Sequence, residues 1–407
     1  MIYPAGFEKK IGFDTVRLRL ADLCLTAAGR AYVGEMSFMT EYNSVREAVG
    51  AVAEMADILG GANDFPLAGI HDISAALARA KVAGAVVSAD DFRAIRRTVS
   101  TIAEAERFLR DSRDDEGVTP YPILCERGQW LDPLPELARQ IDRVIDSAGN
   151  VLDSASPELA RIRSELARVG ATVNSILRRV MGRAVADGYL EADATPAVRD
   201  GRLVLPVSPM NKRKIPGIVH DESASGKTYF IEPAEVVEVN NRVRELEIDE
   251  RREITRILGE LTAFLGQFVE PLSAAVEVMG WFDFVHAKAR YAVETDAVMP
   301  HLSAKPELEW YRAVHPVLLA SLRQRGLEVV PLDICLSETS RILVISGPNA
   351  GGKSVTLKTV GIVQYMLQCG MLPTVRENSH MGIFDDIFVD IGDDQSIEND
   401  LSTYSSH

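Results

Sequence analysis

The sequence is poor in cysteine, in aromatic residues and in long apolar runs. Its 407 residues include 4 cysteines and 6% aromatic residues. Cys24, Cys125, Cys335 and Cys369 lack the spacing of a metal or redox site, so we expect packing residues in a reducing compartment. No apolar run reaches membrane-spanning length, and the N-terminal MIYPAGFEKKIGFD is charged where a signal peptide needs an apolar segment. These features predict a cytoplasmic protein with no membrane partner.

Basic residues are outnumbered by acidic ones. The 44 Lys and Arg against 59 Asp and Glu give a net charge of -15, which argues against a protein that binds polyanions over its whole surface. Any nucleic-acid contact must therefore be local. The length predicts two or three domains with ample core.

The first third of the chain is helical in pattern. Residues 13–110 are rich in Ala, Leu and Arg at helical spacing, with interruptions near 60–66 and at 88–90, where a helix N-terminus is predicted. Residues 111–135 carry charge, Pro and Gly and predict a linker or irregular loop, after which helices resume. We therefore expect a helical core over residues 1–155.

Two heptad seams follow. Ser156, Pro157 and Glu158 form a helix start, with a capping hydroxyl, a proline in the first turn and an acid at the positive end of the dipole. The first seam is Leu159, Ile162, Leu166, Val169, Val173, Ile176 and Val180, and the second, with one change of phase, is Val236, Val239, Val243, Leu246, Ile254, Ile257, Leu261, Phe264 and Phe268. They predict a lever helix in 156–194 and a returning helix with core in 234–300, paired antiparallel as an arm of roughly 45 Å. A helix pair packed on a globular core is the alternative.

Short strands are predicted between these helices, in a clamp module at 195–233. The strand-like runs are 203–207, 215–220 and 227–231, separated by Gly and Pro. Against Asp200, Asp221 and Glu222 the module carries six cations, a local charge of +3 that suits contact with a phosphate backbone: Arg199, Arg202, Lys212, Arg213, Lys214 and Lys227. A solvated hairpin tip is the alternative. His220 fits a packed strand residue as well as a functional one.

The stretch around which the chain is organised is RILVISGPNAGGKSVTLKTVG at 341–361. An apolar run at 342–345 has the length and branching of a buried strand, and a glycine-rich loop and a helical pattern follow it. This is the Walker A arrangement, in which backbone N–H groups and the helix N-terminus bind phosphates, Lys353 reaches the terminal phosphates and the Ser354 hydroxyl holds Mg²⁺. The sequence therefore predicts a nucleoside triphosphate with Mg²⁺, bound by Gly347, Pro348, Asn349, Ala350, Gly351, Gly352, Lys353 and Ser354.

The nucleotide domain is expected to begin near residue 301. Within it, IFVD at 387–390 has the pattern of a Walker B strand, an apolar run followed by Asp, but Ile391 occupies the position where a water-orienting acid would follow. We therefore do not assign Asp390 as the metal ligand, and the sequence names no catalytic residue.

With these residues in view, the chain resembles the bacterial MutS superfamily, specifically its second type, which is linked to suppression of recombination and rescue of stalled ribosomes. The resemblance covers nearly the whole chain. It rests on VLDSASPEL at 151–159, PGIVHDESASG at 216–226, VEVNNR at 237–242, GPNAGGKS at 347–354, DIGDDQSI at 390–397 and LSTYSS at 401–406.

The resemblance implies a multidomain α plus α/β protein. It implies a helical core, an antiparallel coiled-coil lever with a small β clamp, and an ABC-type P-loop ATPase domain, partly present at 301–407, through which two subunits form a homodimer. Ser402 matches the signature-loop serine that reaches the γ-phosphate bound by the partner in that family. The family's Walker B strand is expected after His407, as is a C-terminal Smr nuclease domain, so we expect little ATP turnover and no endonuclease activity from this sequence.

Two functions of different class remain. The first is a dimeric ATPase whose nucleotide state moves a clamp around branched DNA or a collided ribosome, two targets that a reader of backbone charge does not distinguish. The second is a binding scaffold in which ATP is a structural ligand. Mismatch repair proper is not expected, since the resemblance includes no N-terminal mismatch-reading module that would carry the family's Phe-x-Glu wedge.

Overall fold

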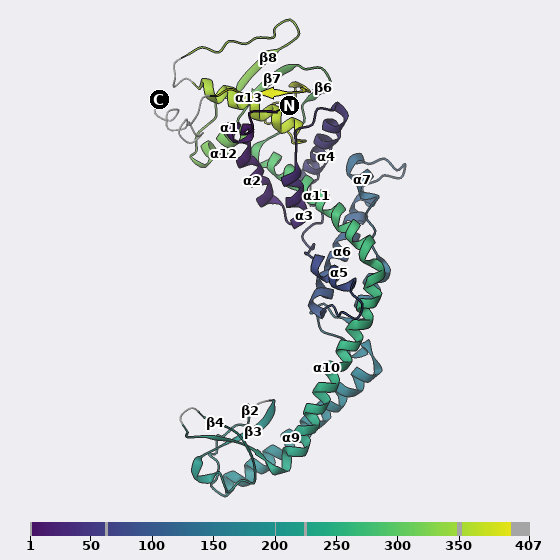
Figure 1. Ribbon diagram of the computed structural model, residues 1–407, viewed down its shortest axis with the longest axis vertical. Helices are drawn as coiled ribbons and strands as arrows, with labels where there is room; N and C mark the ends of the chain where they lie inside the picture. The colour runs from purple at the N-terminus through teal and green to yellow at the C-terminus, as the bar shows by residue number, and fades with distance from the viewer. Residues whose placement is uncertain (1, 62–63, 200, 224–225, 348–351, 392–407) are drawn as a thin grey trace. The chain divides into compact units, whose positions relative to one another are not determined.

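The computed structural model describes residues 2–61, 64–199, 201–223, 226–347 and 352–391 (Figure 1). The chain divides into two compact units, one made of residues 1–73, 94–135 and 268–407 and the other of residues 74–93 and 136–267. Helices dominate both units and small sheets accompany them, which confirms a mixed, multidomain α plus α/β architecture. No helix among the described residues is both long enough and apolar enough to cross a membrane.

The first unit is built around α11 (Val269–Thr295), which packs against three helices from the N-terminal part of the chain. Its core includes Phe7, Phe13, Met55, Phe282 and Trp310, each almost fully buried. The remaining helices with residues in this unit are α1 (Phe7–Ile11), α2 (Phe13–Leu23), α3 (Ala27–Glu35), α4 (Tyr42–Gly60), α6 (Ala89–Asp111), α7 (Pro122–Gly128), α12 (Pro316–Gln324) and α13 (Lys353–Gln368).

The four-stranded sheet of this unit has the order β6-β9-β7-β8. The strands are β6 (His301–Ser303), β7 (Leu308–Ala313), β8 (Leu332–Leu336) and β9 (His380–Gly382). β6 and β9 are parallel, and the other two pairs are antiparallel. A separate parallel pair joins β1 (Ile2–Tyr3) to β10 (Ile387–Phe388), so the first residues of the chain lie beside the segment that leads to Asp390.

The buried strand predicted at 342–345 is not formed. Residues 341–347 form no helix and pair with no described strand, and the side chains of Ile342 and Val344 are 84% and 82% exposed. Leu343 and Ile345 line a cavity of about 390 Å³, which side chains of β7, β8 and α13 also line. A strand needs a neighbour to accept and donate its backbone hydrogen bonds. No described segment lies in register beside residues 342–345, so the prediction is wrong for this structure.

The loop predicted at 111–135 contains a helix. α7 (Pro122–Gly128) buries Leu124 and Cys125, and its first amides donate to one carboxylate of α4: Ile123 N and Leu124 N lie 3.1 and 2.9 Å from the Glu54 oxygens. An acid at a helix N-terminus satisfies amides that have no partner inside the helix. Because this acid comes from a distant part of the chain, the local pattern gave no sign of the helix.

The second unit contains the two long helices predicted from the heptad seams. They are α9 (Pro157–Ala186) and α10 (Val237–Leu265), which run antiparallel side by side (Figure 1). The Ser156 hydroxyl accepts a hydrogen bond from Leu159 N at 3.0 Å, which confirms the predicted helix start. The other elements with residues in this unit are α5 (Ser74–Ala80), part of α6, α8 (Pro135–Val144) and short 3-10 turns at Asp153–Ala155, Pro209–Asn211, Ala234–Val236 and Gly266–Phe268.

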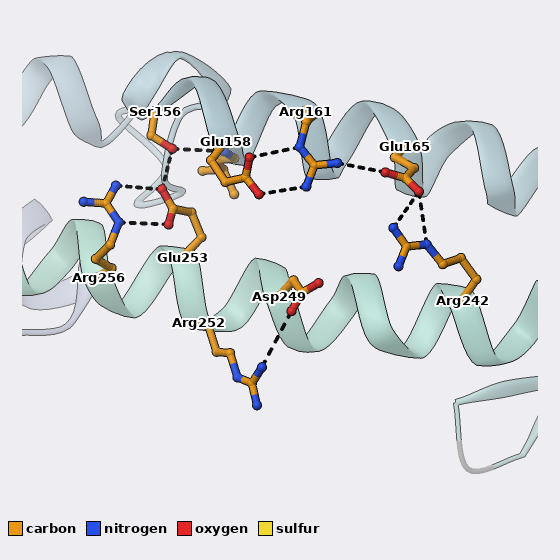
Figure 2. A network of polar contacts seen from close by, with 10 residues as sticks. Ser156, Glu158, Arg161, Glu165, Arg242, Asp249, Arg252, Glu253 and Arg256 are labelled. Carbon is orange, nitrogen blue, oxygen red and sulfur yellow. Dashed lines mark hydrogen bonds and ion pairs between the residues drawn. The ribbon is translucent and has the colours of Figure 1, made fainter.

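Polar contacts fix the register of α9 against α10 (Figure 2). Glu165 of α9 accepts from Arg242 of α10 at 2.8 Å, and Ser156 donates to Glu253 of α10 at 2.6 Å. Hydrogen bonds from Arg256 and then from Ser156 lower the pKa of Glu253 to about 2. Exposed pairs of this kind add little stability one by one. Their effect is to set the register of α9 against α10, because each contact forms only when the two helices have this axial offset.

A four-stranded antiparallel sheet packs on the C-terminal part of α9 (Figure 1). Its order is β2-β3-β5-β4, with β2 (Ala197–Arg199), β3 (Arg202–Val207), β4 (Gly217–Glu222) and β5 (Tyr229–Pro233). One face buries Leu205, Val207 and Ile231 against Val173 and Leu177 of the helix. The predicted clamp module is therefore a sheet with a core of its own, carried by the helix pair. We call β2 to β5 and their connections the basic module.

Candidate functional site

The phosphate-loop residues stand at the start of α13. Lys353 and Ser354 are the first two residues of this helix, and Gly352 precedes them with φ at 78°, a left-handed conformation that glycine adopts without strain. The Lys353 ammonium donates to the Gly347 carbonyl, so the two ends of the loop are in contact. Pro348, Asn349, Ala350 and Gly351 lie outside the described residues.

This arrangement fits a phosphate group. The N-terminus of a 16-residue helix carries free amides and the positive end of the helix dipole, and an ammonium and a hydroxyl stand beside it. A triphosphate would take the ammonium, and Mg²⁺ would take the Ser354 hydroxyl together with phosphate oxygens. Among the described residues, no group of three or more His, Cys, Asp or Glu side chains is placed to hold a metal ion.

Asp390 is exposed and lies two residues after the end of β10 at Phe388. Its neighbour Ile391 accepts a hydrogen bond from Lys10 at 3.2 Å through its carbonyl oxygen. The β10 segment is thus attached to the N-terminal part of the chain through β1 and Lys10. Ser402, the residue matched to the family's signature loop, lies outside the described residues.

Two of the six cations predicted to contact nucleic acid are held by acids of the basic module. Arg199 Nε lies 3.2 Å from Asp221, and the Arg199 guanidinium also lies 4.0 Å from the centre of the Phe230 ring. Arg202 Nη1 lies 2.8 Å from Glu232, and its side chain is 19% exposed. Both arginines therefore help to build the basic module in this arrangement.

Glu232 is the centre of a buried polar network. It accepts from Arg202, from His220 Nε2 at 2.6 Å and from Asn240 Nδ2 at 2.8 Å, and its side chain is 0% exposed. Burial by itself raises the pKa of a carboxyl, but the hydrogen bonds from Asn240, His220 and Arg202 outweigh it, so the pKa of Glu232 is lowered. His220 is thus a packed strand residue here, at the irregular position between Val219 and Asp221 of β4.

The other four cations are not held by acids in the part of the chain that the structure describes. Lys212, Arg213, Lys214 and Lys227 form no ion pair with any described residue. Arg213, Lys214 and Lys227 are exposed and Lys212 is half-buried. Counting Glu232, the module has six cations against four acids, so its charge is +2 and not +3. The excess is concentrated at these four side chains.

Two lysines of this set lie over tyrosine rings. Lys212 Nζ is 3.9 Å from the centre of the Tyr229 ring, and Lys214 Nζ is 4.9 Å from that of Tyr189. A ring face holds an ammonium in place without neutralising it. Neither tyrosine nor Glu232 was predicted from the sequence as a site residue. The available signal for Glu232 was an acid directly after the apolar end of the strand predicted at 227–231.

The chain is similar to known proteins over almost its whole length. The family model described as MutS domain V matches residues 343–407. Proteins named Endonuclease MutS2 align over 98% of this chain: that of Pelotomaculum thermopropionicum is 38% identical over 399 residues, that of Enterococcus faecalis 37% over 397 and that of Ligilactobacillus salivarius 35% over 399. The chain belongs to the MutS superfamily and is of the MutS2 type.

The chain spans about half the length of the curated relatives it matches, 49% in each of these three. The name endonuclease describes those longer proteins. For this MutS2-type chain, the alignment covers both the basic module and α13, so the two candidate sites lie within the shared region.

Proposed function

We propose that this chain binds ATP with Mg²⁺ at the start of α13 and contacts nucleic acid through the basic module. The observation that carries the proposal is that Lys353 and Ser354 open a long helix directly after a left-handed glycine, in a chain of the MutS2 type. When bound, Mg²⁺ would draw charge from the phosphate oxygens. Lys353 would bind the terminal phosphates, and Ser354 would orient the metal.

Lys353→Ala tests this proposal. We expect loss of Mg·ATP binding with an unchanged fold, because a charge-assisted contact to phosphate is removed from an exposed side chain and no core cavity opens. Titration calorimetry gives the affinity and far-ultraviolet circular dichroism the fold. Lys305→Ala, which removes one exposed lysine of the same unit, is the matched control. Equal affinity in the wild type and Lys353→Ala would remove the nucleotide site from α13.

Nucleic acid is the partner proposed for the basic module. The support is the positive charge of four cations that form no ion pair with any described residue, in a protein of net charge -15. Contacts to phosphates position a protein on a strand without reading its sequence. We therefore propose that the target is branched DNA or ribosomal RNA. We also propose that the protein binds this target as a homodimer in the cytoplasm.

A scaffold that holds ATP without turnover is the second candidate. The observation that favours it is the unpaired segment 341–347, which leaves the approach to the phosphate loop outside the sheet. Precise placement of water and metal is a large part of phosphoryl-transfer catalysis. Phosphate release distinguishes the two candidates.

A further inference from the structure

A buried lysine lies under the end of α13 that is opposite to the phosphate loop. Lys288 of α11 is 4% exposed, and its ammonium donates to the Cys369 carbonyl at 2.9 Å. The same nitrogen lies 4.1 Å from the centre of the Phe284 ring. The lysine, the ring and α13 all belong to the first compact unit.

This lysine is costly to bury. Desolvation lowers the pKa of Lys288 to about 7, the Cys369 thiol opposes that change, and the positive charge of Arg17 adds to it. Arg17 itself binds Glu8, which also accepts from Tyr365 of α13 at 2.8 Å. The titratable groups that act on Lys288 are thus the Cys369 thiol and the Arg17 guanidinium, and Arg17 is in turn paired with Glu8. A methionine would fill the same space without the desolvation cost.

The contact fixes the C-terminal end of the helix. Carbonyls of the last turn have no partner inside a helix, and a cation there also favours the negative end of the dipole. Beside the Lys288 contact, Gln368 O accepts from Met39 N at 2.7 Å, and the Gln368 amide donates to Phe384 O at 2.7 Å. With 16 residues, α13 spans roughly 24 Å from this anchor to Lys353.

We propose that Lys288 is a positioning residue for the nucleotide: by holding the Cys369 carbonyl it sets where Lys353 and Ser354 stand at the other end of α13. The inference rests on the proposed function of the phosphate loop. The protonated amine makes the stronger, charge-assisted bond to the carbonyl. Protonation of Lys288 therefore favours nucleotide binding, and by reciprocity nucleotide binding favours protonation of Lys288.

Titration calorimetry with Mg·ADP between pH 6.5 and 8.5, in two buffers of different ionisation enthalpy, tests this coupling. For the wild type we expect proton uptake on binding and an affinity about five-fold lower at pH 8.5, near the lower end of ordinary coupling between sites. Lys288→Met should bind more weakly at pH 6.5 and have a shallower profile. The nucleotide's own titration is common to both proteins and cancels in the difference. Lys288→Arg, charged throughout, should keep its affinity at pH 8.5.

The outcomes separate this inference from the function on which it rests. A wild type that binds no Mg·ADP overturns both. Binding by the wild type and none by Lys353→Ala upholds the nucleotide site, and equal proton uptake and pH slope in the wild type and Lys288→Met then overturn the role of Lys288 alone. If Lys288→Met does not fold by circular dichroism, the same pH slope in the wild type and Lys288→Arg overturns it.

Discussion

Arg202 and Arg213 carry the same charge in the same module, yet only Arg213 is exposed and free of an ion pair with the described residues. The difference comes from Glu232, whose buried carboxylate must be satisfied by donors from several elements. At the scale of residues, Glu232 holds Arg202 and Asp221 holds Arg199, so these two cations help to build the basic module. The other four cations form no ion pair with any described residue.

Glu232→Gln tests this network. We expect a loss of about 2 kcal/mol in the free energy of opening of β3 and β5, because hydrogen bonds to a charged acceptor are weakened. The folded state lowers the pKa of Glu232, so its stabilisation is present above the unfolded value of about 4.3 and fades as the pH falls below it. Native-state hydrogen exchange at pH 7 and pH 4 measures both effects.

Glu191→Gln is the control, since Glu191 is an exposed acid in the same unit. Protection of β3 and β5 that is equal in Glu232→Gln and the wild type at pH 7 would show that the network adds no stability.

At the scale of elements, Lys212, Arg213 and Lys214 form one basic turn, in which Arg213 and Lys214 are exposed and Lys212 is half-buried. Changing all three to Ala should weaken binding similarly for DNA of different sequence, and should flatten the dependence of log K on log salt by up to about three charges. Binding is measured by fluorescence anisotropy on four-way junctions at several salt concentrations. The control replaces exposed Lys9, Lys305 and Arg325 by Ala, with the same change in net charge. Similar salt slopes in the two triple variants would place the contact elsewhere.

The exposure of residues 342–345, the segment before the phosphate loop, can also be tested at the scale of elements. Val344 is 82% exposed, so Val344→Ala should change the free energy of unfolding by no more than about 0.5 kcal/mol. Val363→Ala, at a fully buried position of α13, should cost about 2 kcal/mol. Denaturant unfolding followed in parallel for both variants makes the comparison. A Val344→Ala cost close to that of Val363→Ala would show that residues 342–345 form a buried strand.

At the scale of the whole molecule, nucleotide binding and assembly are expected to be linked. If ATP joins two subunits, Mg·ATP should raise the mass measured by light scattering toward that of two chains, and Lys353→Ala should abolish the rise. Phosphate release measured on the same samples should be low and unchanged by Asp390→Asn, because the sequence gives Asp390 no metal role. A loss of phosphate release in Asp390→Asn would place that carboxylate in the metal site.

Local signals in the sequence determined much of this architecture. The start of α9 at Ser156 and Pro157, the antiparallel helix pair and three strands of the basic module were predicted and are present. Three of the four cysteines are buried as expected, and Cys335 is exposed on β8. Caps, periodicity and turn residues act over a few positions, so the sequence displays them directly.

Only the tertiary structure decided which partners each residue meets. α7 begins at the Glu54 carboxylate, and residues 342–345 have no described strand partner. Glu232 is enclosed by donors from β3, β4 and α10, and Lys288 is buried under α13. Each outcome depends on which segments the folded chain brings together. A pattern of residue types shows that a side chain can pair or be buried, whereas the energy of doing so depends on the donors, acceptors and apolar surface that the fold brings to it.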